Sequence, residues 1–171
     1  MVHKFSLTLV LAMMAAPAFA ADYQVALGPM PVDDETKQFI AGRGQATITS
    51  DGKTMTVTGD FHGLPSNATE GHIFLSPVIG VPGKPVGALE VTKSTSGTVS
   101  GNFKLNNAEA AALRAGRLYI QLDSEKAPAN DVPWGPKGTL WGWIFQAHET
   151  VGQDVPQQDH WFIPQIDTPS S

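Results

Sequence analysis

Apolar and polar residues alternate along several segments of the chain, which is the pattern of half-buried β-strands. Between residues 54 and 61, for example, Met55, Val57 and Phe61 share one face and threonines occupy the other. The alternation is clear over 54–61, 98–105 and 117–123, and weaker over 44–49, 71–75, 87–92 and 138–145. These segments predict a mainly β domain.

Turn and helix signals separate the predicted strands. Asp51-Gly52 favours a tight hairpin, because both residues tolerate the positive φ of a two-residue turn. Asn106 and Glu109 have the spacing of a helix-capping box, and Gly116 suits the left-handed end of a helix. One short helix is therefore predicted over 108–115.

The first twenty residues have the pattern of a cleavable signal peptide. Lys4 precedes an apolar run, and Ala18-Phe19-Ala20 fits the small-x-small cleavage site, with Ala21 as the new N-terminus. The apolar run is shorter than the roughly 20 residues that a spanning helix needs. The chain has no cysteine, so it forms no disulfide and no thiolate metal site. Export without cysteine indicates a bacterial periplasmic or secreted protein.

The other residues suit one domain of mainly β structure over residues 21–147, followed by a polar tail over 148–171. We expect the tail to dock on the domain through Trp161-Phe162-Ile163. Seventeen Gly and thirteen Pro favour many turns. The net charge of -5 is spread thinly without a basic cluster, which argues against nucleic acid and against anionic membrane surfaces as partners.

No catalytic motif is found in the chain. Ser66, Ser76 and Ser100 all lie outside a Gly-x-Ser-x-Gly elbow, and the spacing of a phosphate-binding loop is absent. We therefore predict a protein that is not an enzyme.

Aromatic residues concentrate near the C-terminus. Alternation puts Trp141, Trp143 and Phe145 on one face, and Trp161 follows in the tail. Two interpretations stay open: these side chains fill the core, or Trp141, Trp143 and Trp161 form a partner-binding surface.

Several segments resemble the CHRD (chordin-type) domain family, in the family's order. The strand and turn from Val57 to Thr69 resembles the family signature, and Gly71-His72-Ile73-Phe74 resembles its His-Ile-His strand. Three further matches are Ser96 to Gly101, Leu105 to Gln121 and Leu140 to Ile144. The resemblance implies an all-β, immunoglobulin-like antiparallel β-sandwich with one short helix, outside the cytoplasm. It implies no reaction.

The resemblance also implies a metal site, here with a reduced set of ligands. The family often has two histidines on alternate positions of one strand and a third after the helix. Here His72 is kept, Phe74 takes the second position and Asp123 the third. A copper or zinc ion held by His72 and Asp123 would need water or another ligand such as Glu70.

Two functional hypotheses follow. The first is an exported, non-catalytic binding module for an unidentified extracytoplasmic protein or other ligand. The alternative is a periplasmic copper- or zinc-binding protein that uses His72 and Asp123.

Overall fold

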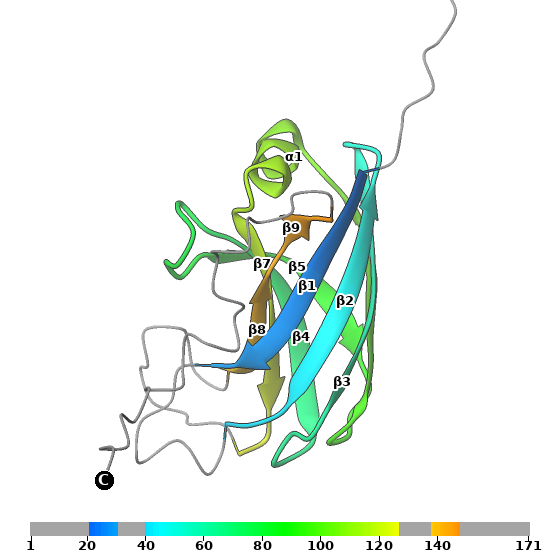
Figure 1. The fold of residues 1–171 in the computed structure, drawn as a ribbon, viewed down its shortest axis with the longest axis vertical. Helices are drawn as coiled ribbons and strands as arrows, with labels where there is room; N and C mark the ends of the chain where they lie inside the picture. Colours follow the sequence, from blue (N-terminus) through cyan, green and yellow to red (C-terminus); the bar gives the residue numbers. More distant parts are fainter. Residues whose placement is uncertain (1–20, 31–39, 127–137, 148–171) are drawn as a thin grey trace, which may run out of the picture.

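The computed structural model describes residues 21–30, 40–126 and 138–147, and they form nine strands and one helix (Figure 1). The strands are β1 (Ala21–Pro29), β2 (Arg43–Ser50), β3 (Thr54–His62), β4 (Ala68–Leu75), β5 (Lys84–Val91), β6 (Gly97–Lys104), β7 (Leu118–Ser124), β8 (Gly138–Trp143) and β9 (Phe145–Gln146). The helix is α1 (Asn107–Arg114).

The strands close into an eight-stranded antiparallel β-barrel, with β9 continuing the line of β8 beside β1. The order around the barrel is β2, β3, β6, β5, β4, β7, β8, β1, and β1 then pairs with β2 to complete the circle. The predicted immunoglobulin-like sandwich is therefore wrong. A sandwich keeps two separate sheets, whereas here β1 pairs with β2 on one side and with β8 and β9 on the other.

Strand β1 was not predicted, although it carries the alternation that defines a half-buried strand. Tyr23, Val25 and Leu27 are buried, and Asp22, between the predicted cleavage site and Tyr23, is exposed. The predicted strand segments all correspond to observed strands, with ends that differ by a few residues. Because β1 is the strand that closes the barrel, a prediction without β1 could not include the closure.

The barrel interior is filled by the inward-facing residues of every long strand. Its largest fully buried side chains include Ile48, Met55, Val57, Phe61, Ile73, Leu118, Ile120, Leu122 and Leu140. Helix α1 closes one end, because its Ala112 and Leu113 join the same cluster (Figure 1). The predicted capping box is confirmed, since Asn106 Oδ1 accepts from the Glu109 backbone N–H and Glu109 Oε2 accepts from that of Asn106.

The predicted hairpin at Asp51-Gly52 is also confirmed, but its loop has three residues, 51–53, instead of the two that were predicted. Gly52 has a φ of +83°, the left-handed conformation that glycine adopts without a steric penalty. Asp51 Oδ1 accepts from the backbone N–H groups of Thr54 (2.6 Å) and Lys53 (2.8 Å). These bonds, that of Thr54 first, hold the pKa of the Asp51 carboxyl below its ordinary value of 3.8.

Candidate functional site

The outer face of β4, β7 and β8 brings most of the predicted site residues together. Across these strands the register aligns His72 with Gln121 and Gln121 with Trp141. In the next row, Phe74 pairs with Tyr119 and Tyr119 with Trp143. Because directly opposed residues of neighbouring strands share a face, these two rows form one surface on the outside of the barrel.

Aromatic rings pack against one another across this surface. Phe74 stacks on Tyr119 with ring centroids 5.0 Å apart, and Tyr119 contacts Trp143 (4.8 Å) and Trp141 (6.1 Å). Trp141 and Trp143 are only 8% and 5% exposed. They therefore offer a partner little contact area, and partner binding through them stays a prediction. Trp161, like the tail that carries it, lies outside the described residues.

The two predicted metal ligands share the outer face without forming a metal site. Half-buried His72 lies opposite Gln121, and Asp123 lies two residues further along β7, opposite Glu70. Asp123 Oδ1 accepts a hydrogen bond from Gln121 Nε2 at 2.9 Å. Across residues 21–30, 40–126 and 138–147, no group of three or more His, Cys, Asp or Glu is placed to hold a metal ion.

Copper or zinc does not fit this pair of side chains as a protein-held ion. Phe74, where the resemblance expects a second histidine, has its ring committed to the stack on Tyr119. It contacts His72 only edge to face, with centroids 6.2 Å apart. The second imidazole has thus been replaced by a member of the aromatic cluster. Protein zinc sites use three or four ligands, and His72, Asp123 and Glu70 are not placed as a group that could hold a metal ion.

Gln121 is the centre of this outer face and has one unsatisfied atom. Its side chain is 4% exposed, and its Oε1 has no hydrogen-bond partner. The amide orientation is fixed chemically, because the Asp123 carboxylate requires the N–H side of the amide. Leaving a buried acceptor unpaired costs about 1–3 kcal/mol. This residue was not singled out from sequence, since alternation predicted an exposed side chain.

The loop between β4 and β5 is the exposed apolar part of the described chain. Val78, Ile79 and Val81 are 56%, 48% and 40% exposed, and Val86 just beyond the loop is also exposed. These four are all of the large hydrophobic side chains that are exposed in the described segments. We call Val78, Ile79 and Val81 the apolar tip. In Figure 1 the loop, in green, projects from the barrel wall below α1.

Although its apolar side chains face solvent, the loop is held by a buried hydroxyl. Ser76 Oγ lies 2.5 Å from the Val78 carbonyl oxygen and 2.6 Å from that of Val81, and it accepts from the Val78 N–H. The Val81 N–H donates to the Val78 carbonyl across a turn in which Gly80 has a φ of +87°. The loop is therefore ordered by its own hydrogen bonds.

Two residues tie the loop to the barrel: Arg117, directly before β7, and Tyr119 within it. Arg117 Nη1 donates to the carbonyl oxygens of Pro77 (3.4 Å) and Ser76 (3.5 Å). The phenol oxygen of Tyr119 accepts from the Gly83 N–H at 3.1 Å. Tyr119 thus belongs to both the aromatic cluster and the support of the loop. Nothing in the sequence pattern marked this contact, because it joins positions 36 residues apart.

Burial raises the pKa of Tyr119 above its ordinary 10.0, and the Gly83 N–H partly offsets this. The proton is held more tightly in the folded state, so this contribution to stability is present below pH 10 and is lost as pH rises above it. At neutral pH we expect Tyr119→Phe to be less stable by about 0.5–1.5 kcal/mol, through loss of the hydrogen bond. Above pH 10 this gap should close, because only the wild type has this phenol to ionise. Urea unfolding across alkaline pH checks this, and a constant gap would contradict it.

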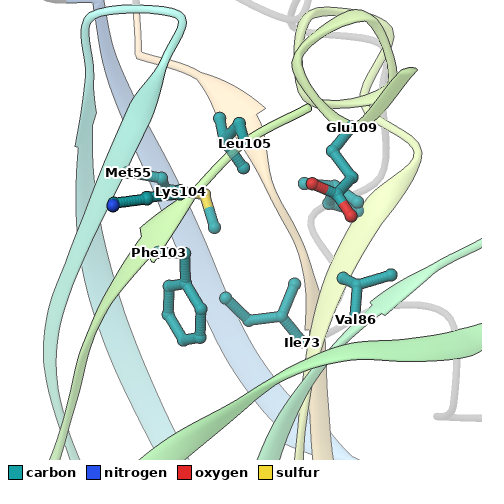
Figure 2. Close-up of a pocket in the computed structure, with 8 residues that line it drawn as sticks. Met55, Ile73, Val86, Phe103, Lys104, Leu105 and Glu109 are labelled. Carbon is teal, nitrogen blue, oxygen red and sulfur yellow. The ribbon is translucent and has the colours of Figure 1, made fainter. Parts of the chain in front are cut away.

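A small hollow lies between the barrel strands and α1 (Figure 2). It is lined mainly by apolar side chains, with Lys104 and Glu109 at its edge. Its volume is about 10 Å³, which is room for about one water molecule. Its lining contains no histidine, and the hollow is too small for a substrate.

The described residues form a small antiparallel β-barrel that is closed at one end by a helix. An aromatic cluster, covered from solvent, lies on the outer face of its wall, and an apolar loop projects from it. The CHRD domain family matches residues 23–132, so the chain belongs to the CHRD domain family. The resemblance inferred from its motifs is confirmed. No curated protein and no solved structure matches the chain.

Proposed function

We propose that this protein is an exported, non-catalytic binding module whose contact surface is the β4–β5 loop. The observation that supports this is an ordered loop with an exposed apolar tip. Moving aliphatic side chains out of water lowers the free energy, and a soluble domain usually buries them. A loop that is held in shape while presenting them is suited to docking.

Export is the part of the proposal that concerns residues outside the described fold. The predicted leader covers residues 1–20, and the first described strand begins at Ala21, directly after the predicted cleavage site. Cleavage there would leave the barrel intact. Within the described residues, no helix is long and apolar enough to cross a membrane. The periplasm or the outside of the cell is the proposed location.

Photo-crosslinking in intact cells tests the proposed function. A photo-reactive amino acid would replace Ile79 in the apolar tip, and Thr47, which is exposed on β2, would be the control position. We expect crosslinks, to protein or to lipid, from position 79 and none from position 47. Equal crosslinking at both positions, or none at either, would contradict a docking role for the loop.

Metal analysis tests the alternative function. Because Phe74 has replaced one imidazole, we expect protein purified without chelators to carry no stoichiometric copper or zinc, with wild type and His72→Ala alike. Elemental analysis of both proteins, before and after addition of either metal, checks this. Near-stoichiometric metal in the wild type that is lost in His72→Ala would establish the metal-binding alternative instead.

A further inference from the structure

We infer that the β4–β5 loop docks on an anionic phospholipid surface, with Val78, Ile79 and Val81 entering the interface between headgroups and acyl chains. This inference rests on the proposed function, since it names the partner of the same loop. It goes beyond that proposal because it names a lipid surface as the partner. Three observations carry it: the shape of the loop, the hydrogen bonding of its backbone and the charges beside it.

The shape of the loop favours a fluid partner. The loop projects from the barrel wall (Figure 1), and its exposed apolar surface is limited to three aliphatic side chains. A stable protein interface buries roughly 800 Å² on each partner, with aromatic and arginine anchors at its centre. The apolar tip supplies neither. A bilayer needs no complementary pocket, because lipids rearrange around an inserted side chain.

Two residues of the apolar tip, Val78 and Val81, have backbone groups that are prepared for a medium with little water. A polar backbone group that enters apolar surroundings must keep an internal hydrogen bond. The carbonyl oxygens of Val78 and Val81 both turn inward to Ser76 Oγ. The Val78 N–H donates to the same hydroxyl, and the Val81 N–H donates to the Val78 carbonyl. The polar groups of these two tip residues are therefore satisfied without water.

The charges around the loop complement an anionic surface. Lys84 follows the loop, and residues 71–89 contain no Asp or Glu. Arg117 binds the loop carbonyls of Ser76 and Pro77. The end of α1 lies beside the tip, because a Cβ added at Gly116 would lie 3.6 Å from Ile79 Cδ1. Arg114 is exposed in the last turn of α1, two residues before Gly116.

The acidic residues of the same hairpin lie away from the tip. Glu70 and Glu90 stand near the opposite ends of β4 and β5 from the loop. The overall charge of -5 predicted no affinity for anionic membranes, but it averages over this local arrangement. A few cations beside an apolar tip attract anionic lipid within about a Debye length, whatever the charge on the far side of the barrel.

Co-sedimentation with vesicles tests the inference. The protein without its leader would be mixed with phosphatidylcholine vesicles or with vesicles of three parts phosphatidylcholine and one part phosphatidylglycerol. We expect binding that requires phosphatidylglycerol and weakens with salt. Val78→Ser/Ile79→Ser should weaken binding roughly ten-fold or more, since several buried CH₂ groups are lost. Lys84→Gln should weaken it about five-fold, and Lys53→Gln, at the β2–β3 hairpin, should not.

Thermal unfolding of each variant shows whether the barrel is intact, and no loss is expected because the changed side chains are exposed. Equal binding to phosphatidylcholine alone, or equal effects of Lys84→Gln and Lys53→Gln, would overturn the anionic-lipid assignment. So would crosslinks from position 79 to a protein in cells together with no binding to vesicles. That last result would leave the binding module standing with a protein partner, whereas no crosslink to either protein or lipid would remove both.

Discussion

Replacing Ile73 with alanine is expected to lower the free energy of unfolding by about 2–5 kcal/mol, whereas Ile79→Ala is expected to change it by less than about 0.5 kcal/mol. Ile73 lies inside the barrel on β4 and is fully buried. Its truncation removes apolar contacts and leaves a cavity that the neighbouring strands fill only in part. Ile79 lies six residues further on, in the exposed tip, and is already half in water.

Urea unfolding of the two alanine variants beside the wild type measures the difference. The comparison is matched, because the same side chain is shortened in the same way at both positions. If Ile79→Ala cost as much as Ile73→Ala, the loop would be part of the core, and its apolar tip would need no partner to explain it.

Gly142→Ala is expected to destabilise the barrel by about 1–3 kcal/mol or more, because it crowds the seam where β8 meets β1. A Cβ at Gly142 would lie 2.5 Å from Cγ1 of Val25 and closer still to the carbonyl oxygen of Ala26. The nearest atom, the Ala26 oxygen, belongs to the backbone, so a change of side-chain rotamer cannot relieve the contact. The backbone of β1 cannot move away without loosening its pairing with β2.

Gly28→Ala is the matched control at the same seam. Gly28 is on β1 and pairs with Trp141 of β8, and an added Cβ there meets nothing within 4 Å. We expect a change of less than about 0.5 kcal/mol. Chemical denaturation of both variants checks the pair. Equal stabilities would mean that the close approach of β1 and β8 is not needed, and would argue against the closed barrel.

The strands could be predicted from alternation, but their closure into a barrel could not. An inward-facing strand has the same pattern in a sandwich and in a barrel, so 54–61 and 98–105 fit both folds equally. The difference lies in β1, which pairs on both of its edges. That information is in the pairing of distant segments and has no local signal in the sequence.

Strand β7 shows why the outer face was only partly predicted. Leu118, Ile120 and Leu122 face the core as expected, but Tyr119 and Gln121 on the opposite face are also buried. A second hydrophobic cluster, on the outside of the barrel, therefore buries positions that alternation assigns to solvent. The prediction that Trp141 and Trp143 share a face is consistent with their ring contact at 5.8 Å. Their burial depends on neighbours from other strands, which no single segment reveals.

The apolar tip has a signal in the sequence that does not by itself indicate a docking surface. Residues 77–82 combine two prolines and one glycine with Val78, Ile79 and Val81, and they contain no charge. Apolar residues in a turn fit a core contact as well as a docking surface. The exposure of the tip argues against a core contact, and this exposure, like the inward direction of the Ser76 hydroxyl, is a property of the folded chain.

The most direct test of loop docking uses the absence of cysteine from the chain, which permits labelling at one chosen position. Ile79→Cys and Thr47→Cys would each carry a fluorophore whose emission shifts to the blue in an apolar environment. On addition of vesicles that contain phosphatidylglycerol, we predict a blue shift at position 79 and none at position 47. No shift at position 79, or equal shifts at both positions, would contradict insertion of the apolar tip.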